Sequence, residues 1–408
     1  MAEIIFGREE LWKEGFYDSS KDTFSEVAGE VSQWSYNNSH IVEGKRLGDG
    51  YRSGRILRVR EKFRKLFNGI GVYPDGVGTK VIAHASMQRH EIAAHDIMAM
   101  TLDDAIVQGD LPTSFNSVLD ARDINEDLSW FTIMIYELGK IAEKQGVVLL
   151  AWETANLWPC VSTPNPNSKS AFNWSGFATS LKHPLIHHPE GNQTNFWKLE
   201  PGNVVVALEQ GGFRSNGISA VRRAFEAKYG LDWLCEAPRS ELENAFQASE
   251  IYSRAVGEAL GWHNPFSEND VKAEEFEFQA DIRGIVHLSG GSFKWKLYDG
   301  LLEPKWVSAV FDNLYPTPEI VKKVFEWQQM IPEKLSRKPD VSTIQEVYQT
   351  FCAWQWMLVV LGNESEADKF LSIIGKKHIH GRKAGVITAN QKWGHSKLEI
   401  SGDHISLN

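Results

Sequence analysis

Short apolar segments typical of strands alternate with longer helical patterns in both halves of this sequence. Between the halves, residues 182–195 (KHPLIHHPEGNQTN) combine prolines, a glycine and polar side chains without apolar periodicity, which indicates a surface connection near a domain boundary. The mixture of element types in each half favours an α/β or α+β class. With 408 residues the chain is long enough for two domains, which we place at residues 1–182 and 183–408.

The spacing of apolar residues predicts the individual elements. In the first half we expect strands at residues 77–83, 113–121, 147–152 and 172–181, and helices at 58–67, 91–108 and 126–144. In the second half we expect strands at 201–208, 282–288, 354–361 and 382–388, and helices at 218–228, 240–260, 318–327, 343–350 and 364–374. The first 45 residues are polar with scattered aromatic side chains, and their pattern favours no single element.

Charge and composition disfavour several classes of function. The net charge of -10 argues against nonspecific binding to nucleic acid. No stretch of about 18 apolar residues occurs, so we expect no membrane span. The N-terminal residues carry acids where a signal peptide has an apolar run. Cys160, Cys235 and Cys352 are far apart and form no CxxC pair, which argues against a disulfide framework or structural zinc site and favours a reducing cytoplasm.

Residues 73–84 (YPDGVGTKVIAH) concentrate groups that suit a phosphate and a metal ion. The spacing is not that of a Walker A loop. Gly76 and Gly78 would let backbone N–H groups approach an anion, and Lys80 could offer a mobile positive charge. Asp75 adds a hard oxygen ligand for Mg²⁺. The alternative is an ordinary Pro-Asp-Gly turn that leads into a strand.

Further acids follow this loop. Asp96 and Asp103 are seven residues apart on the next expected helix and therefore share a face, and Asp104 lies about 80° away. Glu153 comes directly after a buried strand. Together with Asp75 these acids could hold one or more Mg²⁺ ions. The alternative is that Asp103 and Asp104 solvate an exposed helix face.

Two other polar segments leave alternatives open. Residues 44–54 (GKRLGDGYRSG) are glycine-rich and basic, which suits either a phosphate clamp or a flexible connection. His183, His187 and His188 could ligate a metal, but no acid or cysteine is spaced with them as in known metal sites. Solvated loop residues are the simpler interpretation of these histidines.

Five segments carry motifs in a fixed order along the chain. They are DGVGTK with the acidic helix and VQGDLP that follow it (75–112), WETAN (152–156), GGFRSNGISAVRR (211–223), VHLSGGS (286–292) and VYQTFCAWQWMLVV (347–360). In this order they resemble the DGVGTK, GETAE, SGxHSNGYSLVR, AHITGGG and MYRTFNMGIGMVVV motifs of AIR synthetase, the phosphoribosylformylglycinamidine cyclo-ligase of purine biosynthesis. An ordered set of five motifs indicates the family far more specifically than any one motif does.

The resemblance implies an architecture and a reaction. It implies two α/β domains, a homodimer in which the N-terminal sheets join, and ATP with Mg²⁺ bound mainly by the N-terminal domain. In the family reaction the γ-phosphate of ATP activates an amide oxygen, a nearby nitrogen attacks, and the imidazole ring closes as phosphate leaves. Such chemistry needs positioning and charge neutralisation more than covalent catalysis.

The resemblance also assigns residues. It implies Mg²⁺ ligands at Asp75, Asp104 and Glu153, and catalytic roles for Lys80, Asp104 and Arg214. It implies ATP contacts from Gly76, Val77, Gly78, Thr79, Lys80, Asp96 and Thr154. On the substrate side it implies Ser215, Asn216, Gly217, His287, Gly290 and Gly291. For His287, a core or capping role is the alternative.

The chain departs from the family mainly on the substrate side. Arg214 replaces the histidine of SGxHSNG, and arginine cannot shuttle protons near neutral pH although it can bind phosphate or carboxylate. Trp152 replaces a glycine, Asn156 an acid, and residues 353–356 (AWQW) replace the glycine-containing loop. We therefore expect an ATP-dependent, cyclo-ligase-like enzyme in which the nucleotide chemistry is kept. The alternatives are a relative that phosphorylates or ligates a different small substrate, nucleotide-like or phosphorylated, and a catalytically silent, nucleotide-binding dimer.

Overall fold

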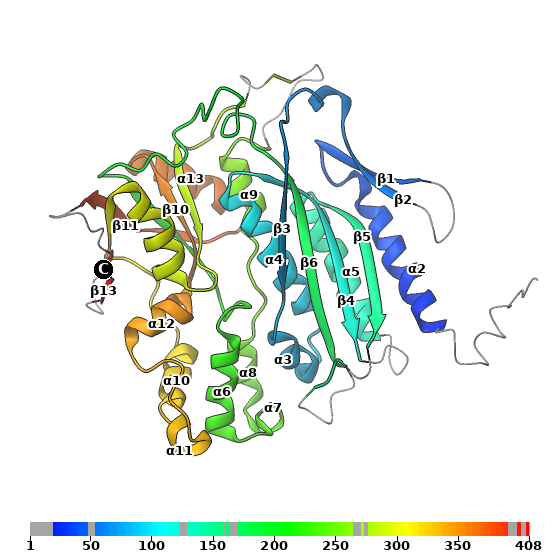
Figure 1. Cartoon of the computed structure of the whole chain (residues 1–408), viewed down its shortest axis with the longest axis vertical. Coiled ribbons are helices and arrows are strands. Elements are labelled where there is room, and N and C mark those ends of the chain that lie inside the picture. The colour runs from blue at the N-terminus through cyan, green and yellow to red at the C-terminus, as the bar shows by residue number, and fades with distance from the viewer. Residues whose placement is uncertain are drawn as a thin grey trace, which may run out of the picture.

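The described part of the chain forms two large β-sheets with helices between and below them (Figure 1). The computed structural model describes residues 19–47, 54–122, 129–157, 160–163, 170–263, 271–272, 276–390, 398–400 and 405–407. A separate antiparallel hairpin pairs β1 (Val42–Leu47) with β2 (Gly54–Val59). The centre of the proposed phosphate clamp at 44–54 lies outside the described residues. Within these ranges no helix has both the length and the apolar character needed to cross a membrane.

The four-stranded sheet belongs to the first half of the chain. Its strand order is β3–β6–β4–β5, antiparallel except for the parallel pair β4–β5. Helices α4 and α5 pack together against one side of this sheet (Figure 1). The bounds are β3 Ile70–Gly76, β4 Leu111–Ala121, β5 Val148–Asn156, β6 Phe172–Leu181, α2 Ser19–Trp34, α3 Lys80–Met87, α4 Glu91–Val107 and α5 Ser129–Gln145. The strands predicted at 113–121, 147–152 and 172–181 and the helices at 91–108 and 126–144 are confirmed.

Helix α4 is the central helix of the molecule. Its sequence, EIAAHDIMAMTLDDAIV, places small or apolar side chains on nearly every face, and most of them are buried. A helix that is apolar all round is stable only when it is enclosed. One side of α4 packs on β3 and β6, and it also contacts α9 (Ser253–Ala259) and β8 (Ile282–His287). The acids of α4 are therefore held where the two halves of the chain meet.

The seven-stranded sheet belongs to the second half. Its order is β13–β12–β9–β11–β7–β10–β8, with β12–β9 as the parallel pair. Strand β10, which lies between β7 and the edge strand β8, is buried along its whole length, and this fits its continuous apolar sequence. The bounds are β7 Val204–Glu209, β9 Val307–Phe311, β10 Gln355–Leu361, β11 Gly381–Ala389, β12 Leu398–Ile400, β13 Ile405–Leu407 and α13 Glu364–Gly375.

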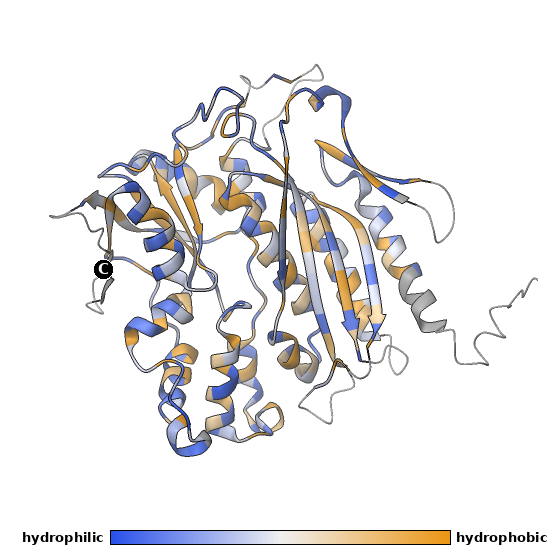
Figure 2. Ribbon diagram, viewed as in Figure 1, coloured by the Kyte–Doolittle hydropathy of each residue, from blue (hydrophilic) through white to orange (hydrophobic). Residues whose placement is uncertain are grey.

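A group of helices lies at the lower end of the molecule (Figure 1). Their alternating hydrophilic and hydrophobic stripes are visible in Figure 2. Many aromatic residues fill their shared core, among them Phe225, Trp233 and Trp327, so several of the 15 tryptophans are structural. The bounds are α6 Ile218–Tyr229, α7 Trp233–Glu236, α8 Arg239–Ala245, α10 Glu319–Gln328, α11 Ile331–Leu335 and α12 Ile344–Thr350.

The strand predicted at residues 77–83 is wrong. Strand β3 ends at Gly76, and helix α3 begins at Lys80. Pro74 lies inside β3 instead of forming a turn, which is tolerated because β3 is the edge strand of its sheet. Gly78 has φ +66 and turns the chain between strand and helix.

The single helix predicted at residues 240–260 is also wrong. The chain forms two short helices there, α8 and α9, with an irregular segment between them. Backbone amides of this segment and of the start of α9 donate to the buried carboxylates of Asp96 and Asp103. A buried carboxylate needs donors, and satisfying two of them outweighs the local preference for one long helix.

Two smaller differences concern short elements. The helix predicted at 58–67 is the end of β2 followed by a 3₁₀ turn, η2 (Glu61–Phe63). Between the GGS motif and residue 318 the sequence pattern indicates no element, whereas the structure has the ten-residue π-helix η4 (Phe293–Leu302) and strand β9.

Candidate functional site

A cavity of about 300 Å³ opens where the two halves of the chain meet. Its polar wall comes from Tyr73 on β3, Asp104 and Gln108 at the end of α4, His287 at the end of β8, and Lys296 on η4. Trp197 and aliphatic side chains complete the lining. A concave space with a few converging polar groups is the usual form of a small-molecule site.

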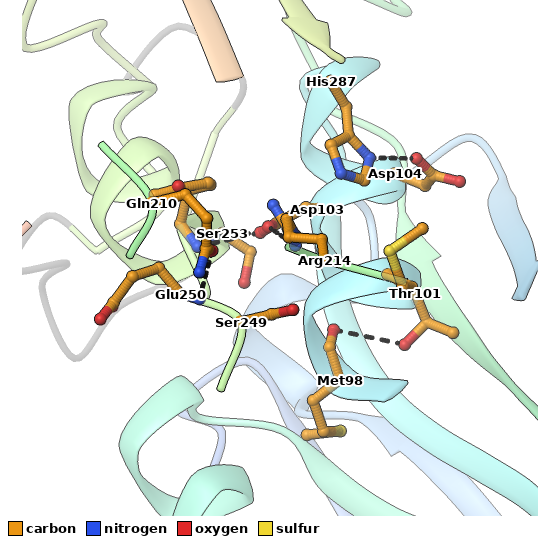
Figure 3. Close-up of polar contacts among 12 residues, drawn as sticks. Met98, Thr101, Asp103, Asp104, Gln210, Arg214, Ser249, Glu250, Ser253 and His287 are labelled. Atoms are coloured by element: carbon orange, nitrogen blue, oxygen red, sulfur yellow. Dashed lines mark hydrogen bonds and ion pairs between the residues drawn. The ribbon is translucent and has the colours of Figure 1, made fainter. Parts of the chain in front are cut away.

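Asp104 and His287 form a hydrogen-bonded pair in the wall of this cavity (Figure 3). Nδ1 of His287 lies 2.7 Å from Oδ1 of Asp104. Nε2 of His287 is buried and has no hydrogen-bond partner among the described residues. A carboxylate on Nδ1 orients the ring and leaves Nε2 to accept or donate a proton.

Burial alone would raise the pKa of Asp104. The hydrogen bond from His287 and the charges of His287, Lys296 and Arg214 outweigh burial, so the pKa of Asp104 lies below its usual value. Asp104 is therefore ionised at neutral pH, as a metal ligand or a histidine partner must be.

Asp75 stands near this pair at the end of β3. Burial raises its pKa, the N–H of Gly76 at 2.7 Å opposes that shift, and the charge of Asp104 adds to it. Two carboxylates that raise each other's cost of ionisation are stabilised by a shared divalent cation. Mg²⁺ often takes only one or two carboxylates and completes its shell with water and phosphate, so Asp75 and Asp104 fit such an ion.

Glu153 does not join this pair within one chain. It lies on β5, three strands from β3, which corresponds to about 14 Å at the usual spacing between strands. It is also exposed, on a strand at the opposite edge of the sheet. Across the described residues no group of three or more metal-ligating side chains forms. The three-ligand site at Asp75, Asp104 and Glu153 is therefore not assembled in this chain.

The structure corrects the expectation that Lys80 offers a mobile charge. Its side chain is 0% exposed, and Nζ lies 2.9 Å from Oδ1 of Asp96 and 2.6 Å from the carbonyl oxygen of Gln247. Asp96 also accepts from the hydroxyl and the backbone N–H of Ser249. His84 lies 3.3 Å from the other oxygen of Asp96, and burial lowers its pKa to about 3, so it is neutral. Lys80 and Asp96 thus join α3 and α4 to the segment before α9.

Arg214 is likewise enclosed. Its Nη2 lies 2.8 Å from Oδ2 of Asp103, and both side chains are 0% exposed (Figure 3). Oδ1 of Asp103 accepts from the amides of Tyr252 and Ser253, each at 3.0 Å. The guanidinium also stands over the rings of Tyr252 and Trp356, at 5.4 and 5.6 Å. Two departures from the family motifs, Arg214 and Trp356, therefore pack on each other.

The two predicted substrate loops lie together against α4. Asn216 approaches Met100 of α4, and its Oδ1 would lie 3.7 Å from a Cβ at Gly290. Gly217 has φ +75 and no room for a side chain, since a Cβ would meet the carbonyl of Thr350 at 2.7 Å. The structure therefore brings Ser215, Asn216 and Gly217 close to Gly290 and, through α4, to the Asp104–His287 pair.

The replaced glycine loop keeps an unusual backbone. Trp354 has φ +68 and Cys352 has φ +57, conformations that only glycine adopts freely. Trp354 is anchored by its indole N–H to the carbonyl of Gly211 at 2.9 Å and by an edge contact with Phe213. Such strain persists only where the surroundings hold it, and it is common at binding sites.

The remaining residues predicted to contact ATP differ in exposure and location. Gly78 and Thr79 are exposed next to Asp75, whereas Val77 is buried in the core. Thr154 is buried on β5, and its hydroxyl accepts from the indole of Trp152 at 2.6 Å. The structure places Thr154 on the far strand of the sheet from β3.

Several residues of the cavity wall were not found from sequence. They are Tyr73, Gln108, Trp197 and Lys296. Tyr73 donates to Asp110, which also holds Lys182 at 2.7 Å, and burial with that hydrogen bond raises the pKa of Tyr73 to about 12. The only signal in the sequence was position: Tyr73 precedes DGVGTK, and Lys296 follows VHLSGGS.

Comparisons with known proteins decide the fold. No protein-family model matches the sequence. The structure is similar to Escherichia coli HypE, a hydrogenase maturation protein, with a TM-score of 0.52 over 95% of this chain and 96% of HypE at 9% identity. It is also similar to a hydrogenase maturation protein HypE in complex with ATP, with a TM-score of 0.51, 14% identity, and 96% and 95% of the two chains covered. The chain has the AIR synthetase-like fold.

This finding confirms the expected fold class. The likeness extends over nearly the whole chain, so both sheets and the junction between them belong to the shared architecture. The cavity with Asp104 and His287 in its wall lies at that junction.

Proposed function

We propose that the protein is an ATP-dependent enzyme that acts on a small substrate at the junction of its two halves. The observation that carries this proposal is the Asp104–His287 pair in the cavity wall, with Asp75 beside it. A HypE protein of similar fold has been crystallised in complex with ATP. The charges suit a nucleotide bound through Mg²⁺, because two ionisable carboxylates and a nearby lysine can balance metal and phosphate.

Different residues of this chain would bind the metal ion, move a proton and bind the substrate. Asp75 and Asp104 would hold Mg²⁺, which would neutralise phosphate charge when bound. Asp104 would also orient His287, whose unpartnered Nε2 would hold or remove a proton of the substrate. The loops at 215–217 and 290–291 would bind the substrate from the other side.

Two substrates remain candidates within this function. One is formylglycinamidine ribonucleotide, the substrate of the cyclo-ligase that the motifs resemble. The other is a different small nucleotide-like or phosphorylated molecule. The packing of Arg214 on Trp356 and the anchoring of Trp354 favour the second, because these side chains fill a region where the family has smaller residues.

A homodimer is part of the proposal. The four-stranded sheet exposes apolar side chains, namely Ile70 and Val72 on β3, Val118 on β4 and Phe177 on β6, with exposures from 37% to 70%. Exposed apolar residues on three strands of one sheet suit a protein partner better than water. A second copy that joins its own sheet here would cover them.

The deciding experiment measures Mg-ATP binding and ADP release by the purified protein, with and without formylglycinamidine ribonucleotide. Asp104→Asn serves as the control for contaminating ATPase activity. We expect Mg-ATP to bind and Asp104→Asn to abolish ADP release. Stimulation by the ribonucleotide would establish the cyclo-ligase, and its absence would leave the second substrate class. A folded protein that binds no Mg-ATP would refute the proposal.

A further inference from the structure

The π-helix η4 forms one wall of the cavity. A π-helix bonds residue i to residue i+5, so residues four and five apart share a face. Lys296, Gly300 and Leu301 have this spacing, and all three line the cavity. Helices of this kind are rare and are frequent at functional sites. The spacing therefore directs Lys296 to the same space as Asp104 and His287.

The start of η4 is fixed against the glycine loop. Ser292, directly before η4, has φ +44. A Cβ at Gly291 would lie 2.4 Å from the ring of Trp295, so the indole packs directly on the glycine. This contact holds Lys296, the next residue, beside the loop that follows His287.

Lys296 faces two carboxylates without forming an ion pair. Lys296 lines the cavity together with Asp104, and its charge favours the ionised form of both Asp75 and Asp104, although burial still leaves the pKa of Asp75 raised. Yet no carboxylate of the described residues lies within ion-pair distance of its Nζ, and the ion pair of Asp104 is with His287. The ammonium group is thus near the acids but remains available to a ligand.

Lys294, two residues earlier, is the contrasting case. Its Nζ lies 2.8 Å from Oδ1 of Asp299 and 4.2 Å from the centre of the Tyr298 ring. It does not line the cavity. The two lysines share one helix and one charge but differ in their surroundings, which makes Lys294 a matched control.

We propose that Lys296 is the phosphate-binding lysine of this site, and that its ammonium group contacts a phosphate oxygen of Mg-ATP in the cavity. The inference rests on the proposed function. Lys296 would then supply the positive charge to phosphate that the sequence motif assigned to Lys80. Lys80 itself is buried in an ion pair with Asp96. A compact, flexible ammonium suits a phosphate oxygen.

The contact depends on the metal ion. Without Mg²⁺, the carboxylates of Asp75 and Asp104 would repel a phosphate more strongly than one lysine attracts it. With Mg²⁺ between them, the carboxylates are neutralised and Lys296 adds a charge-assisted hydrogen bond. Lys296 should therefore contribute to nucleotide binding only when Mg²⁺ is present.

The test titrates Mg-ATP into the full chain and into Lys296→Met and Lys294→Met by calorimetry. Loss of a charge-assisted hydrogen bond should raise the Kd of Lys296→Met by about tenfold or more, while Lys294→Met stays within about twofold. Lys296→Arg should keep most of the affinity, because it keeps the charge. Adenosine, which has no phosphate, should bind Lys296→Met and the unchanged protein alike. Thermal unfolding of each variant checks that the fold is intact.

Three outcomes would overturn the inference. In the first, Lys296→Met binds Mg-ATP as well as the unchanged protein does, which leaves the proposed function standing. In the second, Lys294→Met loses as much affinity as Lys296→Met, which shows a general effect of charge. In the third, the unchanged protein binds no Mg-ATP, and the proposed function falls together with the role of Lys296.

Discussion

Asp103 and Asp104 are neighbours on α4, but their surroundings are opposite. Asp103 is fully buried and held by Arg214 and two backbone amides, and burial raises its pKa despite the charge of Arg214. Asp104 faces the cavity, and its bond to His287 helps to lower its pKa. One residue type on one helix is thus buried in an internal ion pair at one position and lines the cavity at the next. The difference lies in which neighbouring segment each carboxylate meets.

The same division separates Lys80 from Lys296. Lys80 belongs to the enclosed region, with Asp96 and the segment before α9. Lys296 belongs to the cavity. We expect substitutions in the enclosed region to act on stability, and substitutions at the cavity to act on binding and turnover.

The largest expected effect is at the cavity. His287→Gln should lower kcat by about 10²- to 10⁴-fold, the usual contribution of a positioned general acid or base. Its stability should change little, because glutamine can still donate to Asp104. Steady-state ADP release and chemical denaturation measure the two quantities. A variant that unfolds readily but turns over normally when folded would place His287 with the enclosed residues instead.

The next effect is in the enclosed region. Arg214→Met should lower the free energy of unfolding by about 3–5 kcal/mol, because it leaves Asp103 buried without its cation. Adding Asp103→Asn should recover part of this loss. Urea denaturation of the three proteins provides the measurement. Full stability with lost substrate binding would instead show that Arg214 belongs to the active surface.

The third prediction concerns pH. His84 has a pKa of about 3 in the folded chain because it is buried, against 6.5 in the unfolded chain. As pH falls below 6.5, the unfolded chain takes up a proton that the folded chain does not, so stability is lost. For His84 alone the loss at pH 5 is about 2 kcal/mol. His84→Gln should flatten the pH dependence of unfolding by that amount, whereas His188→Gln, in a half-exposed connection, serves as control. An unchanged slope in His84→Gln would show that His84 can be protonated in the folded protein.

The smallest expected effect concerns how Mg²⁺ binding beside the cavity depends on pH. The raised pKa of Asp75 means that, as pH falls, Asp75 takes up a proton before Asp104 does. Mg²⁺ affinity should therefore weaken as pH falls through the pKa of Asp75, since a metal ligand must be ionised. Calorimetric Mg²⁺ titrations at several pH values measure this change. Asp75→Asn should bind Mg²⁺ more weakly and lose the dependence; equal dependence in both proteins would remove Asp75 from the metal site.

Part of the fold could be predicted from sequence because the signals were local. Strand β6 and helix α4 have clear periodicity or composition, and both were placed nearly to the residue. The start of α3 could not be predicted, because β-branched Val81 and Ile82 favour a strand until the packing of α3 on α4 is known. The break between α8 and α9 depends on carboxylates more than 140 positions away in the chain.

The candidate site divides in the same way. Asp75, Asp104 and His287 are candidates from the sequence because they belong to ordered motifs. Lys296 carries no motif and became visible only when η4 was placed beside the cavity. Lys80 was misjudged because a lysine in a glycine-rich loop resembles a phosphate ligand, and no local signal shows that Asp96 encloses it.

The sequence by itself determined the fold class, the order of most elements and the acids that gather along α4. These follow from hydrophobic periodicity and short motifs, which depend on neighbours within a few positions. The tertiary structure alone decided which acids are enclosed and which face the cavity. Burial and pairing set the charge and the access of a side chain, and both depend on segments that meet only after the chain has folded.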